Sequence, residues 1–177
     1  MTIPEGSFQF GGKNSLTDWG IVVVGHDIFL PQKRSRKITI PGRSGQYDYG
    51  SKLYEDRSLV LDCYLERKIS KAELREIAYA LSEKKRLTLY NEPDKYYVAE
   101  LYDPAEVTDL PLEVMREFSL TFLCEPFAYK ETTEQAITNG VNKMDYQGTA
   151  AAPTRIVIEN PNNYAVSNII ITATKRG

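Results

Sequence analysis

The stretch RKITIPGRSG at residues 36–45 and the stretch SLVLDCYL at residues 58–65 decide the fold class of this chain. Apolar residues recur at every second position in both, and the side chains of a β-strand alternate between two faces. Both stretches are therefore predicted to be strands with one buried face and one wetter face. Between them, Pro41-Gly42 is typical of the central pair of a type II turn, because proline sets the first φ and glycine takes the positive φ that follows.

Length and composition place the chain among globular proteins of one or two domains, with 177 residues and a formal net charge of −2. No apolar run approaches the ~20 residues of a membrane helix, and the N-terminal residues lack the pattern of a signal peptide. Cys63 and Cys124 both occupy apolar alternating positions, which favours buried free thiols of a cytoplasmically folded protein over a disulfide. The twelve tyrosines are a residue type enriched where proteins contact each other.

Alternating or β-branched runs predict further strands. Their expected ranges are 7–10, closed by a turn at Gly11-Gly12; 21–24, covered on both faces and followed by a turn at 25–27; 28–30; 86–90 paired as a hairpin with 96–102; and 113–124, the longest.

One helix is predicted, over about 70–83. Ser70 is a good N-cap, and Glu73 completes a capping box. An apolar stripe follows at Leu74, Ile77, Ala78 and Leu81. A single helix with one apolar stripe must lie against a sheet, so the predicted fold class is mainly β (α+β) with one flanking helix and a β-hairpin.

The character of the sequence changes after the first 130 residues, which are predicted to form one β domain. Residues 131–153 are polar and predict a linker. Residues 154–177 contain two alternating stretches around Asn160-Pro161-Asn162-Asn163 and predict a β-hairpin. Since an isolated hairpin is marginal in water, this segment docks on the first domain, pairs with another chain or opens a larger domain.

Catalytic and metal-binding patterns are not found in the sequence. His26 is the only histidine, in a Gly-His-Asp turn signal, and the two cysteines are too far apart for zinc spacing. Gly42-x-x-Gly45 is too short for a phosphate loop. We predict no catalytic residue, no metal and no cofactor, and hence a protein that is not an enzyme.

Two binding functions stay open on the residues alone. The basic run 33–37, with Arg43, Tyr47, Tyr49 and Tyr54 downstream, could serve a single-stranded nucleic acid, or it could be a solvated strand start. Scattered tyrosines and Trp19 could serve as platforms in a carbohydrate- or receptor-binding β-sandwich.

The order of these pieces resembles the distal tail protein (Dit) family of long-tailed bacteriophages and prophages. The resemblance is carried by five pieces: Phe8-x-Phe10-Gly11 followed by IVVV at 21–24, KITIPGRSG at 37–45, LVLDC at 59–63, FSLTFLCEPFAY at 118–129 after the helix, and GTAAAPT at 148–154. It implies an antiparallel β-sandwich of the tail-tube-related type, ending near residue 130, with a C-terminal sandwich module beginning near residue 154.

The same resemblance implies a structural function. A hexameric ring of such chains joins the tail-tube protein to the tail-associated hub protein at the tail tip, and the ring commonly carries receptor-binding proteins. The protein is then a virion component assembled in the bacterial cytoplasm, without a membrane or sequence-specific nucleic acid as partner. The glycine-rich loop suits close backbone approach, so it is our candidate subunit contact, through Pro41, Gly42, Arg43, Ser44, Gly45, Tyr47 and Tyr49.

Overall fold

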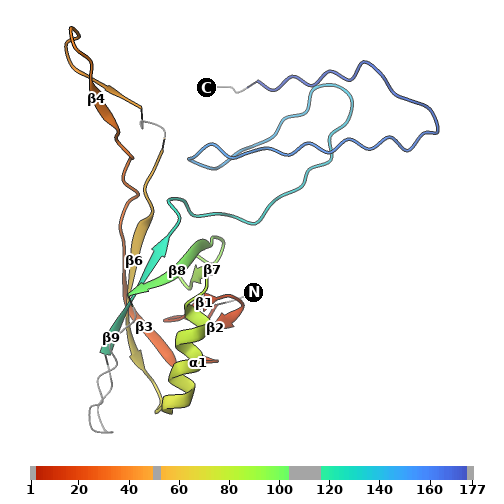
Figure 1. Cartoon of the computed structure of the whole chain (residues 1–177). Coiled ribbons are helices and arrows are strands. Elements are labelled where there is room, and N and C mark those ends of the chain that lie inside the picture. Colours follow the sequence, from red (N-terminus) through yellow and green to blue (C-terminus); the bar gives the residue numbers. More distant parts are fainter. Residues whose placement is uncertain (1–2, 50–52, 104–116, 175–177) are drawn as a thin grey trace. The chain divides into compact units, whose positions relative to one another are not determined.

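The computed structural model describes residues 3–49, 53–103 and 117–174, and the chain divides into two compact units, Met1–Ala136 and Ile137–Gly177. Unit 1 contains every strand and the helix of the described residues (Figure 1). Its main sheet has seven antiparallel strands in the order β2-β1-β7-β8-β9-β6-β3. These strands are β1 (Phe8–Phe10), β2 (Lys13–Asn14), β3 (Ile21–Ile28), β6 (Arg57–Leu65), β7 (Lys85–Leu89), β8 (Tyr97–Asp103) and β9 (Glu117–Cys124).

The main sheet curls until its two halves face each other. Two strands separate β1 from β9, which in a flat sheet would hold them ~14 Å apart. The Phe10 and Phe122 rings nevertheless lie 5.5 Å apart between centroids. The edge strand β3 also meets the segment that precedes β1, because the Val23 N–H donates to the Gly6 carbonyl at 2.7 Å. The predicted mainly β, sandwich-like fold with a single helix is therefore confirmed.

The interior is built from the alternation that the sequence displays. Leu59, Leu61 and Cys63 of β6 are buried, and Leu120, Phe122 and Cys124 of the adjacent β9 are buried beside them. The intervening residues of both strands face outward, as a period of two requires. The prediction for these two strands is confirmed, although residues 113–116 of the longer predicted strand lie outside the described residues.

The helix α1 spans Lys71–Leu81, two residues shorter at its C-terminal end than predicted. The Glu73 N–H donates to the Ser70 hydroxyl at 3.2 Å, so Ser70 is the N-cap. Ile77 and Leu81 are buried in the core of the sheet. Ala78 was predicted to lie on the apolar stripe but is exposed, and Ala80 packs against the core in its place.

Strand β3 corrects two predictions. Residues 25–27 do not form a turn, because β3 continues to Ile28 and pairs with β6 through a bulge between Val23 and Gly25. Pairing with a long neighbouring strand outweighs the turn preference of Gly-His-Asp. Val24 is 65% exposed, so the IVVV run is not covered on both faces.

A second, two-stranded sheet corrects a third prediction. Strand β4 (Lys37–Thr39) pairs with β5 (Gln46–Asp48), not with the main sheet. Its apolar face was predicted to be buried, yet Ile38 is 39% exposed and Ile40 36% exposed. The alternation of residues 36–40 is thus that of a strand whose apolar face unit 1 does not cover.

Unit 2 has no strand in its described residues, 137–174. The turn expected at residues 160–163 is present, since the Asn162 N–H donates to the Asn160 side-chain oxygen at 3.1 Å. The stretches on either side of it are not paired as the predicted hairpin. Ile156, Ile158 and Ile171 are exposed.

Candidate subunit interface

The candidate loop lies at the tip of an arm, by which we mean residues 29–49 and 53–56. The arm continues β3 and β6 beyond the end of the main sheet, with β4 and β5 far along it (Figure 1). Backbone hydrogen bonds join the outgoing and returning segments of the arm along their length. The Arg34 N–H donates to the Leu53 carbonyl at 2.8 Å, the Glu55 N–H to Gln32 at 2.8 Å and the Tyr49 N–H to Arg36 at 2.9 Å.

The tip of the arm is a tight turn with aromatic side chains beside it. The Arg43 N–H donates to the Ile40 carbonyl at 3.2 Å, and Gly42 has a φ of 79°, which accords with the predicted turn. The Arg43 guanidinium lies 5.6 Å from the centroid of the Tyr47 ring. The Tyr47 and Tyr49 rings meet edge to face, with centroids 4.7 Å apart. Arg43 in the turn, Tyr47 on β5 and Tyr49 just beyond β5 are thus held together at the tip.

The base of the arm is attached to the main body of unit 1. The rings of Tyr54 and Phe127 meet at 5.1 Å between centroids. Arg34 donates to both carboxylate oxygens of Glu55, at 2.8 and 3.1 Å, and this hydrogen bonding lowers the pKa of Glu55. Because both side chains are exposed, the ion pair contributes little to stability. The Arg34–Glu55 ion pair instead joins the outgoing segment of the arm to its returning segment.

Several apolar and aromatic side chains of the arm are exposed. All seven predicted contact residues are exposed, from Pro41 through Gly45 and at Tyr47 and Tyr49. Sequence reasoning missed the exposed side chains nearer the base, which are Phe29, Leu30 and Leu53. The signal that could have found them is Pro31, which cannot donate a ladder hydrogen bond and so marks the place where the main sheet gives way to the arm. Contiguous exposed apolar patches are typical of interaction sites, so the arm is a candidate interface.

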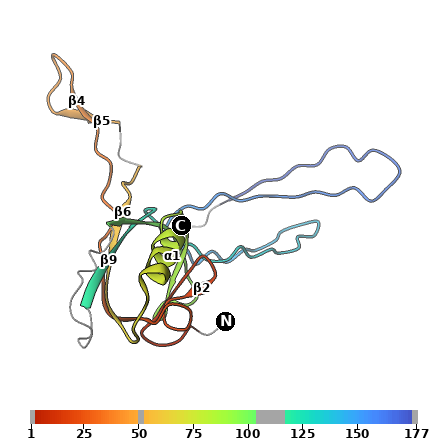
Figure 2. The same ribbon diagram turned by 60° about the horizontal axis from the view of Figure 1, so that its bottom comes forward.

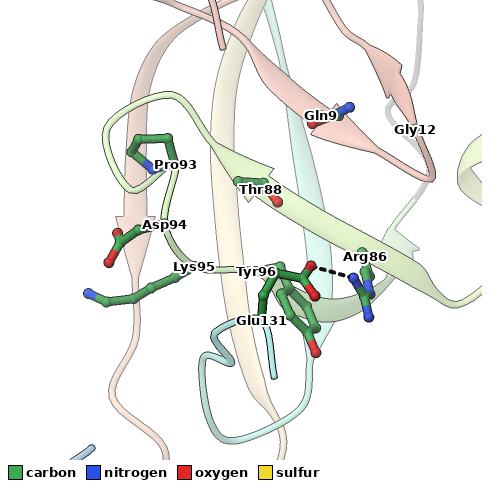
Figure 3. Close-up of a pocket in the computed structure, with 9 residues that line it drawn as sticks. All are labelled: Gln9, Gly12, Arg86, Thr88, Pro93, Asp94, Lys95, Tyr96 and Glu131. Atoms are coloured by element: carbon green, nitrogen blue, oxygen red, sulfur yellow. Dashed lines mark hydrogen bonds and ion pairs between the residues drawn. The ribbon is translucent and has the colours of Figure 1, made fainter. Parts of the chain in front are cut away.

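A second candidate is a surface hollow of about 260 Å³ beside the β7–β8 hairpin (Figure 3). Its charged side chains are already paired: Arg86 with Glu131 at 2.6 Å, and Lys95 with Glu92 at 3.0 Å. The Tyr96 ring lies against the Arg86 guanidinium, 4.2 Å from centroid to Cζ, and stacks on Tyr129. The side-chain contacts around the hollow therefore join residues 128–131 to the β7–β8 hairpin. The ring of Tyr96, which lines the hollow, is engaged by Arg86 and Tyr129 and is not free to stack on a sugar.

Catalytic chemistry finds no assembled site in the described residues. Burial raises the pKa of Cys63 to about 12 and that of Cys124 to about 11, so neither thiol is a nucleophile at neutral pH. Both are free, as predicted. The His26 ring nitrogen Nε2 lies 3.1 Å from the Asn91 side-chain nitrogen. Within residues 3–49, 53–103 and 117–174, no three His, Cys, Asp or Glu side chains gather as a metal site would require.

The structure also shows the positions of two further sequence candidates, Trp19 and the basic run 33–37. Trp19 is 4% exposed and touches Phe8 in the core, so the interpretation of Trp19 as a sugar platform was wrong. The basic run is exposed, as either of its interpretations requires, but Arg34 is paired with Glu55. In the part of the chain that the structure describes, no helix has the length and apolar character needed to cross a membrane.

The family model of the phage tail protein RIFT-related domain matches residues 20–124, more than half of the chain. The chain belongs to this family. The arm, α1 and all strands from β3 to β9 lie within the matched residues. This phage tail protein is accordingly a structural component of the tail, and its resemblance to the distal tail proteins is confirmed.

A solved relative shares the fold of this tail protein. The crystal structure of SPP1 Dit (gp 19.1), described as a paradigm of the hub adsorption apparatus in Gram-positive infecting phages, is similar with a TM-score of 0.51 at 23% identity. The similarity covers 70% of this chain and 51% of the SPP1 protein, so the chain spans about half the length of that relative. No curated protein matches the sequence.

Proposed function

We propose that this tail protein is the ring-forming distal tail protein of a long-tailed phage, placed between the tail tube and the hub of the adsorption apparatus. The family match and the fold shared with SPP1 Dit support this placement. The same proposal includes hexameric assembly and contact with the tail-tube, hub and receptor-binding proteins. It also includes residence in the virion after folding in the cytoplasm. The absence of enzymatic activity, which the buried thiols and paired charges support, belongs to it as well.

The arm is the proposed contact between neighbouring subunits. The observation that carries this proposal is the uncovered apolar face of β4, where Ile38 and Ile40 alternate as in a core strand. Tyr47 and Tyr49, on the returning segment of the same arm, add aromatic surface of the kind that is enriched in interfaces. A ring forms when each subunit contacts the next head to tail and the rotation closes.

Mass photometry of the purified chain tests the arm directly. We expect Tyr47→Ser combined with Tyr49→Ser to weaken self-association by about tenfold or more, because interface aromatics dominate binding free energies. Tyr164→Ser, at an exposed tyrosine of unit 2, is the control and leaves assembly unchanged. Equal assembly of the wild type and the double variant would remove the arm from the interface.

We also propose that residues 1–130 form the ring domain, that residues 131–153 form a linker, and that residues 154–177 contribute to a C-terminal sandwich. The exposed side chains of Ile156, Ile158 and Ile171 support the last step, because alternating apolar segments of this kind form stable strands only when a second layer covers them. Limited proteolysis tests the linker: cleavage confined to 131–153 with an intact fragment of about residues 1–130 is expected. Cleavage within β6 or β9 would contradict it.

A further inference from the structure

The outward side of β3, β6, β9 and β8 carries carboxylates. We name the outward side chains of Asp27, Asp62, Glu100 and Glu117 the acidic face. The register places them together: Asp27 lies opposite Val60, Asp62 opposite Ser119, and Glu117 opposite Tyr64. Since paired residues of adjacent strands point to the same side, and Leu59, Leu61 and Cys63 point inward, these positions point outward.

The acidic face lacks a cation of its own. No outward position of these four strands that the structure describes is lysine or arginine. Asp62 accepts a hydrogen bond from the neutral Ser119 hydroxyl at 2.8 Å. Lys84 borders the face near Glu100, but it is paired with Glu125 at 2.9 Å. Helix α1 leaves the face open, because its buried residues Ile77 and Leu81 join the core on the opposite side of the sheet.

The arm has the opposite charge. Residues 29–49 and 53–56 contain five cations, Lys33, Arg34, Arg36, Lys37 and Arg43, against the three acids Asp48, Glu55 and Asp56. Lys33, Arg36 and Lys37 are exposed, and no carboxylate of the described residues pairs with their side chains. The remainder of the chain must then be net acidic, because the whole carries −2. The arm and the acidic face are therefore complementary in charge.

The arm does not reach the acidic face of its own chain. It runs on from the ends of β3 and β6, away from the sheet, in both views of unit 1 (Figure 2). The ladder between Arg34 and Leu53 and the contact of Tyr54 with Phe127 hold it in that direction. The thirteen residues from Ile28 to Ile40 span up to about 40 Å when extended. This length suits contact with a second copy.

We infer that the basic arm of one copy docks on the acidic face of the next copy, with Arg36 and Lys37 facing Asp62 and Glu117. The inference rests on the proposed ring and names the surface that receives the arm. One surface contacts a different one, so the interface is head to tail and can close by rotation. Charge complementarity fixes the register of such a contact and speeds encounter, while the arm's Ile38 and Tyr47 supply apolar burial.

Charge reversal in both partners tests the inference. The acidic-face variant is Asp62→Lys with Glu117→Lys, the arm variant is Arg36→Glu with Lys37→Glu, and the third protein combines all four. Sedimentation velocity at low salt compares their self-association with that of the wild type. We expect each double variant to weaken association by about tenfold or more and the combined variant to regain most of it. Glu5→Lys and Lys68→Glu, both exposed and outside the two surfaces, are the matched controls.

The outcomes separate this inference from the proposed function. If the wild type self-associates and neither double variant weakens this association, the docking on the acidic face is overturned and the ring still stands. The same holds if the combined variant fails to regain the association that the double variants lose. A wild type that stays monomeric at the highest concentration overturns both. Circular dichroism of every variant tests whether the sheet is intact. If the wild type binds single-stranded DNA and only the arm variant loses this binding, the arm is assigned to nucleic acid instead.

Discussion

Tyr97 links the stability of the sheet to pH. Its side chain is 3% exposed, and its hydroxyl donates to the Glu92 carboxylate at 2.6 Å. Burial first, and then this hydrogen bond, raise the pKa of Tyr97 to about 12. In the unfolded chain the phenol titrates near ~10. Tyr97→Phe removes the hydroxyl and keeps the ring under the Arg57 guanidinium, whose Cζ lies 4.8 Å from its centroid.

The sign of the effect follows from which state binds more protons. Between about pH 10 and pH 12 the native state keeps the Tyr97 proton and the unfolded state loses it, so stability falls as pH rises. A difference of about two pKa units corresponds to about 2–3 kcal/mol, fully present below about pH 10 and lost through about pH 12. At neutral pH, Tyr97→Phe is expected to cost about 1–3 kcal/mol, because Glu92 loses a buried donor.

Urea unfolding followed by Trp19 fluorescence measures both effects, since Trp19 is the single tryptophan and is buried. The free energy of unfolding of the wild type is expected to exceed that of Tyr97→Phe near neutrality and to converge on it towards about pH 12. Tyr102→Phe, at an exposed tyrosine, is the control and parallels the wild type. Two curves that stay parallel above about pH 10 would refute the assignment of the shift to Tyr97.

Three shorter predictions concern the core and its turns. Phe122→Ala is expected to lower the free energy of unfolding by about 3–5 kcal/mol in chemical denaturation, because its ring packs between Phe8 and Phe10; a loss below about 1 kcal/mol would argue against the curled sheet. Gly20→Ala is expected to cost about 1–2 kcal/mol for its φ of +70°, plus the shift of Arg67, whose Cγ would lie 2.8 Å from the new Cβ. Gly12→Ala is the comparison, because a Cβ at Gly12 meets open space and the variant bears only the conformational cost. Equal losses of unfolding free energy in the two variants would show that the Arg67 side chain moves aside at no cost. Cys63 and Cys124 are expected to resist a thiol reagent in the native state at pH 7 and to react in urea; rapid native labelling would contradict their burial.

The elements with the clearest local pattern were predictable from sequence. The alternation of β6 and β9 identified the inward side chains, and Ser70 with Glu73 identified the start of α1. The curl of the sheet was not predictable, because the contact of Phe10 with Phe122 joins residues more than one hundred positions apart. No local spacing encodes which strands become neighbours across such a distance.

The errors in β3 have a physical cause of the same kind. Gly25-His26-Asp27 has the composition of a turn, but each of these residues pairs with β6 in register. A strand of nine residues offers hydrogen bonds that a three-residue turn cannot match. The bulge between Val23 and Gly25 accommodates the glycine and leaves Val24 exposed.

The arm shows what periodicity alone leaves undecided. Residues 36–40 have the same alternation as β6, yet Leu59 and Leu61 are buried while Ile38 and Ile40 are exposed. An apolar alternating face indicates that a strand is covered, but it does not say by which chain. In β6 the cover comes from the same unit, through β9 and the core. For β4 it must come from outside the unit if the pattern has the same meaning, and a neighbouring copy with a complementary charge meets that requirement.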